Sequence, residues 1–222
     1  MLLKKTLIFM LFFPSIVFAD DICSKFKYDV DINLNKIIND DVSIKKSEKN
    51  LVGELGYAKL APGYKYNFYT VTIPVMGGYC ISLREVNIDV IYPSFDIVID
   101  KDLKEDGCAY KYVLEHEKDH IRNTRKVLDS NLENVKEKLL TKVANSINPI
   151  FIKNTEESNS TTSKIGEQLQ NHPEIVEFLK KIDSEIEQEN IKIDTRGDQY
   201  EIYKCKDFFE QRKKVDKMIS TN

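Results

Sequence analysis

The sequence predicts an α+β fold in which an antiparallel β-sheet is followed by a long helix and by C-terminal helices. Residues 25–100 alternate apolar and polar side chains with a period of two, as half-buried strands do. From Cys108 onward the apolar residues recur at helical spacing instead. Because the strands precede the helices, we expect the helices to pack on one face of the sheet.

The expected strands are separated by turn signals. Residues 25–34 alternate cleanly and place five apolar side chains on one face: Phe26, Tyr28, Val30, Ile32 and Leu34. Residues 64–75, 79–91 and 94–100 are rich in aromatic and β-branched residues, which favours strands. The sequences MGG at 76–78 and YPS at 92–94 indicate turns between them.

The longest expected helix covers residues 108–147, which contain neither glycine nor proline. Its apolar stripe comprises Leu114, Ile121, Leu128, Leu132, Val135, Leu139 and Val143. A second helix is expected from Pro173 to about Glu189, because proline suits a first helical turn. A third is expected to start near Asp194 and Thr195 and to carry Tyr200, Tyr203, Phe208 and Phe209.

These patterns divide the chain into four parts: residues 1–19, 20–150, 151–164 and 165–222. The first resembles a cleavable signal peptide, with Lys4 and Lys5 before an apolar run and Val17 and Ala19 before the cleavage point. The second is the β-rich segment plus the long helix. A polar linker and a C-terminal helical segment follow. We therefore expect a periplasmic or secreted protein with no stable membrane span after signal cleavage.

An exported protein matures in an oxidising compartment, so its four cysteines are expected to form two disulfides. Three connectivities are possible, and the sequence does not choose between them. Our first expectation pairs Cys80 with Cys108 and Cys23 with Cys205. The net charge of −3 and the lack of a basic patch argue against nucleic-acid binding. The sequence leaves the oligomeric state open.

The stretch YVLEHEKDHI, residues 112–121, places His116, Glu117 and His120 in the order H-E-x-x-H on the predicted helix. Histidines four residues apart lie on one helix face and can both bind a Zn²⁺ ion. Glu117 lies beside that face, where it can act as general base on a zinc-bound water. The alternative is a solvated charged helix that spells the motif by accident. Lys118 and Asp119 predict that one side of this helix faces solvent.

The third zinc ligand is not evident from the sequence. Glu133 and Glu137 lie about 20 and 25 Å along the helix axis from His120, too far unless the helix breaks. The remaining weak candidates are His172, Glu174 and Glu177, at the start of the second helix.

The run GCAYKYVLEHEKDHIRNTRKVL, together with IDVIYPSFDIVIDKDL and IDTRGDQYEIYKC, resembles secreted or periplasmic bacterial proteins identified as zinc-dependent metalloproteases. The resemblance implies a zincin-like core, with His116 and His120 as ligands and Glu117 as general base. The expected function is thus an exported zinc metallopeptidase that cleaves a protein or peptide substrate. One alternative is a non-catalytic metal-binding or structural envelope protein that uses its helical part to bind a partner. A cell-wall hydrolase with the same zinc chemistry is a third reading.

Overall fold

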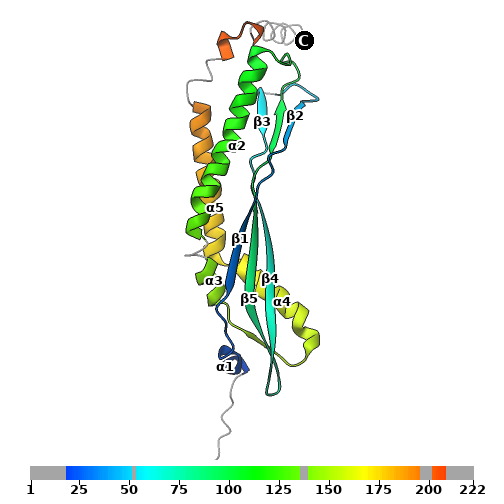
Figure 1. The fold of residues 1–222 in the computed structure, drawn as a ribbon, viewed down its shortest axis with the longest axis vertical. Helices are drawn as coiled ribbons and strands as arrows, with labels where there is room; N and C mark the ends of the chain where they lie inside the picture. Colours follow the sequence, from blue (N-terminus) through cyan, green and yellow to red (C-terminus); the bar gives the residue numbers. More distant parts are fainter. Residues whose placement is uncertain (1–18, 52–53, 136–139, 196–201, 209–222) are drawn as a thin grey trace, which may run out of the picture.

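Two β-sheets lie end to end along the long axis of the molecule in the computed structural model (Figure 1). The structure describes residues 19–51, 54–135, 140–195 and 202–208. Helices and strands both contribute, which confirms the predicted α+β class. The chain passes between the sheets through residues 38–41, 59–62 and 92–94, and the molecule is narrow between the two sheets (Figure 1).

The larger sheet has the order β1-β5-β4, and a short strand, β7, also pairs with β5. Its strands are β1 (Asp31–Ile37), β4 (Gly63–Val75), β5 (Gly78–Ile91) and β7 (Ile150–Ile152). β4 and β5 form an antiparallel hairpin, and β7 is antiparallel to β5. β1 runs parallel to β5.

The smaller sheet has the order β2-β6-β3. Its strands are β2 (Val42–Lys46), β3 (Gly56–Ala58) and β6 (Phe95–Ile99). β2 is parallel to β6 and β3 is antiparallel to it. The expectation of an antiparallel sheet is therefore only partly right, because alternation reveals a strand's two faces but not its direction. The first strand also begins at Asp31, later than predicted.

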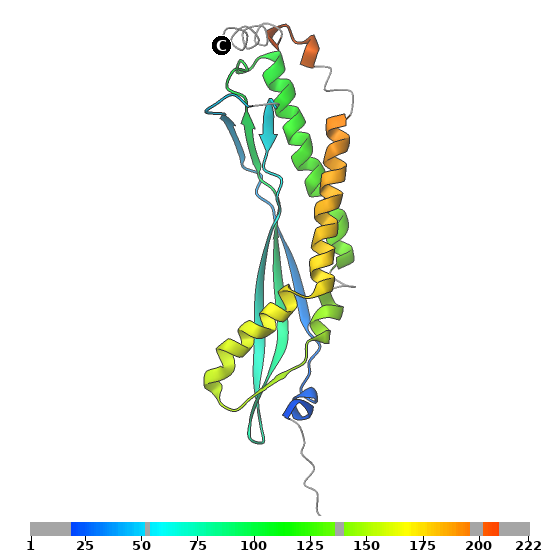
Figure 2. The same ribbon diagram turned by 180° about the vertical axis from the view of Figure 1, so that it is seen from behind.

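Two long helices run side by side in opposite directions along the molecule (Figures 1 and 2). They are α2 (Cys108–Val135) and α5 (Pro173–Thr195). The shorter helices are α1 (Ala19–Ser24), α3 (Thr141–Ser146), the 3-10 turn η2 (Thr155–Glu157) and α4 (Ser158–Gln170). α4 crosses the larger sheet so closely that a Cβ on Gly166 would meet the Phe68 ring at 2.8 Å.

Several helix boundaries differ from the predictions. The helix expected over residues 108–147 is described as α2 to Val135 and as α3 from Thr141 to Ser146, and residues 136–139 between them lie outside the described part of the chain. The predicted polar linker 151–164 includes η2 and the start of α4, whose Thr161 is buried. α5 continues to Thr195, where a third helix was expected to begin. Most of the predicted signal peptide, as well as Tyr200 and Phe209, lies outside the described residues.

Buried apolar side chains form two clusters, one beneath each sheet. The larger includes Val86, Leu128 and Ile182, and so joins β5 to both long helices. The smaller includes Ile97, Val113 and Ile121, and so joins β6 to the first half of α2. α2 therefore contributes to both clusters, and His116, Glu117 and His120 lie between Val113 and Leu128 on this shared helix.

Two disulfides tie the ends of the molecule, but not in the pairing expected first. Cys23 is bonded to Cys80 and Cys108 to Cys205, with Cα–Cα distances of 5.5 Å in both. The expected Cys80–Cys108 bond fails because Cys80 begins β5 at one end of the molecule while Cys108 begins α2 at the other (Figure 1). Within the described part of the chain, no helix combines the length and apolarity needed to cross a membrane.

Candidate metal centre

The H-E-x-x-H residues interrupt the buried stripe of α2. Val113 and Val127 occupy this stripe as apolar side chains, but between them Glu117, His120 and Thr124 are also buried. An amphipathic helix normally places apolar residues at such positions, and buried polar groups need partners.

The outer side of the same helix carries ion pairs. Lys118 pairs with Glu115, and Asp119 pairs with Arg122, as the charges of Lys118 and Asp119 predicted.

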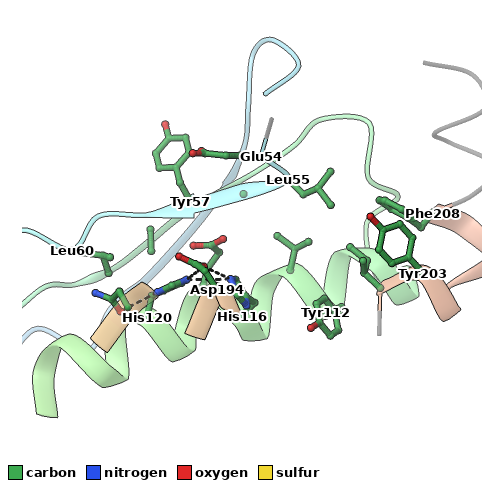
Figure 3. Close-up of a pocket in the computed structure, with 16 residues that line it drawn as sticks. Glu54, Leu55, Tyr57, Leu60, Tyr112, His116, His120, Asp194, Tyr203 and Phe208 are labelled. Atoms are coloured by element: carbon green, nitrogen blue, oxygen red, sulfur yellow. Dashed lines mark hydrogen bonds and ion pairs between the residues drawn. The ribbon is translucent and has the colours of Figure 1, made fainter. Parts of the chain in front are cut away.

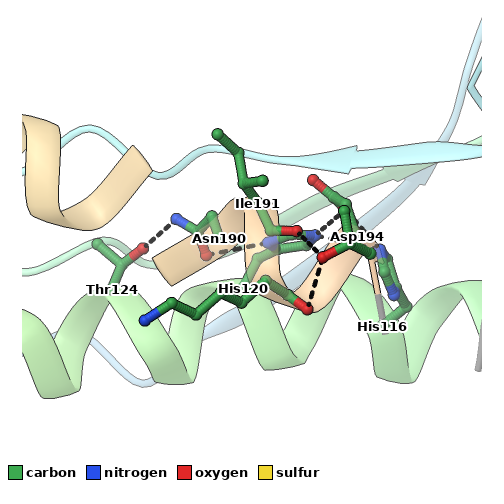
Figure 4. Close-up of polar contacts among 8 residues, drawn as sticks. His116, His120, Thr124, Asn190, Ile191 and Asp194 are labelled. Carbon is green, nitrogen blue, oxygen red and sulfur yellow. Dashed lines mark hydrogen bonds and ion pairs between the residues drawn. The ribbon is translucent and has the colours of Figure 1, made fainter. Parts of the chain in front are cut away.

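The partners of the histidines come from α5. Asp194 Oδ1 lies 3.2 Å from His116 Nε2 and 3.0 Å from His120 Nε2. The two Nε2 atoms are 3.1 Å apart (Figure 3). One turn earlier on α5, Asn190 Oδ1 lies 3.0 Å from His120 Nδ1 (Figure 4). The antiparallel packing of α2 and α5 thus brings Asp194 onto the motif.

This triangle of atoms has the dimensions of a metal site. A tetrahedral ion with ligands at about 2.0–2.1 Å separates them from one another by about 3.3 Å, close to the observed 3.0–3.2 Å. A hydrogen bond is close to linear, so a single proton can join two of these three atoms but cannot join all three. Two imidazoles and one carboxylate also form a donor set suited to zinc, and the three leave a fourth position open.

Glu117 lies beside the triangle as a buried carboxyl group. Burial raises the pKa of Glu117 to about 7, His120 opposes this shift, and the charges of Asp194 and Glu54 add to it. The backbone N–H of Ala58 in β3 donates a hydrogen bond to the Glu117 carboxylate, which also opposes the shift. A carboxyl group with a pKa near 7 exchanges protons readily at neutral pH.

An open pocket of about 690 Å³ lies over these residues. One wall is β3 with its flanking residues, and α2 forms the floor (Figure 3). Gly56 allows β3 to approach α2 closely, because a Cβ there would lie 2.6 Å from Val113 Cγ1. A Cβ on Gly56 would also lie 3.4 Å from Glu117 Cγ, so β3 runs directly beside the predicted base.

The far wall comes from residues 202–208. Ile202, Tyr203 and Phe208 line the pocket. The Cys108–Cys205 disulfide anchors this segment to the first residue of α2. Asp207 adds a second attachment, since its carboxylate accepts a 3.4 Å hydrogen bond from the N–H of Ala109. A carboxylate at a helix N-terminus satisfies free N–H groups and favours the helix dipole.

The structure does not bring the three weak ligand candidates to this site. His172, Glu174 and Glu177 lie at the opposite end of α5, about 26–33 Å along the helix axis from Asp194. His172 lines a different pocket, Glu174 pairs with Lys142, and Glu177 is exposed.

The sequence contains a signal for Asn190 and Asp194, although both lie outside the H-E-x-x-H motif. The apolar stripe Ile175, Ile182 and Ile186 continues to Ile193, so the helical pattern extends past Glu189. Asn190 is a polar residue on that stripe, and Asp194 lies one turn beyond it. A polar break in an apolar stripe indicates a specific partner, which here is α2.

Comparisons of the chain with protein-family models, with curated proteins and with solved structures gave no match. The resemblance to metalloproteases thus stays a prediction, and the function proposed below depends on the geometry of the site.

Proposed function

We propose that the protein is an exported zinc-dependent peptidase. The observation that carries this proposal is the convergence of His116, His120 and Asp194 in an open pocket beside the buried Glu117 carboxyl group. Buried carboxyl groups and converging ligand atoms at a pocket floor are features of active sites rather than of structural helices. The two disulfides support an oxidising compartment and thus export.

In this proposal the Nε2 atoms of His116 and His120 and the Oδ1 atom of Asp194 would hold the ion. A zinc ion bound by three protein ligands lowers the pKa of a water in its open position to about 7. Glu117 is the residue that would take the proton of such a water and return it to a leaving amine. Its pKa of about 7 suits both roles, because neither protonation state is strongly favoured at neutral pH.

Strand β3 is the element we assign to substrate binding. The backbone groups of Leu55 and Lys59 bond to the β6 side, to Asp100 and Asp96. Because these groups alternate direction along a strand, those of Gly56 and Ala58 point away from β6. The Ala58 N–H bonds Glu117, so the groups that we assign to a substrate are the N–H and carbonyl of Gly56 and the carbonyl of Ala58. An extended peptide can add to such an edge through main-chain hydrogen bonds. The apolar walls, Leu60 and Ile202 among them, then accept its side chains.

The test separates metal binding from hydrolysis. We expect one equivalent of zinc in the wild-type protein purified without chelator and reloaded. His116→Ala, His120→Ala and Asp194→Ala should each lose it, whereas His172→Ala, at the other end of α5, should retain it. Folding of every variant is checked by circular dichroism. Zinc retained in all three ligand variants refutes this ligand set.

Hydrolysis is measured on a mixture of unstructured peptides by mass spectrometry. Glu117→Gln keeps the shape of the side chain but cannot accept a proton, so zinc should remain bound while cleavage falls at least about 100-fold. If the Glu117→Gln variant still cleaves peptides, Glu117 is not the general base. If the wild-type protein binds zinc but cleaves no peptide, the non-catalytic metal-binding alternative is the correct one.

A further inference from the structure

We infer that Asn190, held by Thr124, fixes His120 in the tautomer whose Nε2 lone pair faces the metal position. This inference rests on the proposed zinc site, and it makes Asn190 a positioning residue rather than a ligand. It concerns a pair of residues, Asn190 and Thr124, outside the H-E-x-x-H motif. Asn190 and Thr124 act on the metal position indirectly, through Nδ1 of the His120 ring (Figure 4).

A continuous hydrogen-bonded chain supports the inference. Asn190 Oδ1 is 3.0 Å from His120 Nδ1, and Asn190 Nδ2 donates to Thr124 Oγ1 at 3.2 Å. All three side chains are buried, with Thr124 completely inaccessible. Water therefore does not replace these bonds easily, and losing one leaves a buried polar group unsatisfied.

The direction of the bonds determines the tautomer. An amide oxygen only accepts hydrogen bonds, so His120 Nδ1 carries the hydrogen. A neutral imidazole has one N–H, which leaves a lone pair on Nε2. That nitrogen is the one 3.0 Å from Asp194 Oδ1 and 3.1 Å from His116 Nε2. Because a carboxylate oxygen also only accepts, a proton lies between Asp194 and Nε2 in the metal-free protein, and a bound ion would replace that proton. The other tautomer would direct an N–H at the metal position and block coordination until the proton left.

Helix geometry explains why a single residue of α5 reaches the outer side of the ring. Asn190 and Asp194 are one turn apart on α5, as His116, His120 and Thr124 are on α2. The antiparallel helices interleave these side chains, so that His120 lies between Asp194 at Nε2 and Asn190 at Nδ1. The ring is thus held at both nitrogens, which restricts its rotation before an ion binds.

The first experiment is ¹⁵N NMR of the imidazoles in the metal-free wild-type protein, at a pH where the rings are neutral. The chain has only three histidines, so the signals are assigned with His116→Ala and His172→Ala. We expect His120 to be protonated at Nδ1. A His120 Nδ1 without a proton overturns the inference, whether or not Nε2 also shares a proton with Asp194. This measurement needs no metal, so it succeeds or fails independently of the proposed zinc chemistry.

The second experiment measures zinc affinity by competition with a chelator. Asn190→Leu removes the acceptor at similar volume, and the Kd should rise about 10- to 100-fold, as for other groups that orient metal ligands. Asn190→Asp keeps an acceptor and should restore binding to the wild-type level or better. Gln188→Leu is the matched control and should change nothing, because the Gln188 side-chain amide lies on the same helix but its Nε2 donates to Ser184 Oγ at 3.4 Å.

Thr124→Val and Thr124→Ser complete the series. Valine removes the hydroxyl that holds the Asn190 amide, so we expect a smaller loss of zinc affinity, whereas serine keeps the hydroxyl and should bind normally. An equal affinity in the wild-type protein and in Asn190→Leu contradicts the inference. If Asn190→Leu does not fold, the wild-type NMR result and the Asn190→Asp affinity still decide the question.

Discussion

Asp194 Oδ1 lies 3.0 Å from His120 Nε2, although 74 residues separate the two in the chain. The contact exists because α2 and α5 pack antiparallel, which brings the half-exposed Asp194 of α5 against the buried His120 of α2. Asp194 is also in the last turn of α5, which ends at Thr195. The partial negative charge of a helix C-terminus favours a cation there and adds to that of the carboxylate.

Asp194→Asn should weaken zinc binding more than about 100-fold, beyond what is usual for groups that only orient ligands. The amide retains the volume of the carboxylate but lacks its charge. Zinc at about 100 times its Kd should stabilise the wild-type protein by about 2.7 kcal/mol, and should not stabilise Asp194→Asn. Thermal unfolding with and without zinc measures both. Glu189→Gln is the control, because Glu189 is a half-buried carboxylate on the same helix that pairs with Lys192. Zinc stabilisation that survives in Asp194→Asn excludes Asp194 as a ligand.

The sequence sufficed for the α+β class and for two of the three candidate ligands, because both depend on local spacing. His116 and His120 share a helix face by virtue of a four-residue separation. Asp194 depends instead on the packing of α2 against α5, and that long-range contact has no signature within the motif. The helix was predicted to stop at Glu189, and this boundary alone concealed Asn190 and Asp194.

The strand directions and the disulfide pairing could not be predicted for the same physical reason. Alternation places Ile32 and Leu34 on one face of β1, but parallel pairing with β5 is a property of the chain path. Cys23 meets Cys80 because α1 lies at the β5 end of the molecule, a relation that only the assembled fold contains. Four cysteines alone leave three pairings equally open.

Gly56→Ala should reduce peptide cleavage while leaving zinc affinity near the wild-type value. The new Cβ would lie 2.6 Å from Val113 Cγ1 and 3.1 Å from the Val98 carbonyl oxygen, so β3 must move away from α2. Such overpacking typically costs about 1–3 kcal/mol. Kinetics on a cleaved peptide and chemical unfolding measure the two effects.

The second variant for this contact is Val113→Ala, which removes the methyl group that the new Cβ meets. Gly56→Ala combined with Val113→Ala should be less destabilised than the sum of the single changes. Strict additivity would mean that the Gly56–Val113 approach does not hold β3 over the site.

The two disulfides should differ in their effect on the pocket. Replacing either pair with serine should lower the free energy of unfolding by about 2–5 kcal/mol, because the bonds close long loops; the cysteines are 57 and 97 residues apart. The Cys108→Ser/Cys205→Ser variant should also lose peptide affinity, since that bond holds the Tyr203 and Phe208 wall. Cys23→Ser/Cys80→Ser is the matched control, at the far end of the molecule. Equal KM values in the two variants would contradict this role for the wall.

Asp129 should make the stability of the fold depend on acidic pH. Burial alone would raise the pKa of Asp129, but hydrogen bonds from Lys36 and Tyr92 and the charge of Lys36 outweigh burial and hold this pKa below its ordinary value. A carboxyl group with a lowered pKa in the folded state stabilises the protein fully above its unfolded pKa, about 3.9. That stabilisation is lost as the pH falls through the folded pKa.

The measurement is the free energy of unfolding of the wild-type protein and of Asp129→Asn between pH 7 and pH 2. Because Asp129 is 51% exposed, we expect a difference of at most about 1 kcal/mol at neutral pH. The difference should shrink toward zero at the acidic end, where the wild-type carboxyl group is protonated as well. Lys36→Gln removes the nearest cation, so the pH dependence of the Asp129 contribution should weaken in that background. A difference that stays constant from pH 7 to pH 2 would show that Asp129 acts through packing and not through its charge.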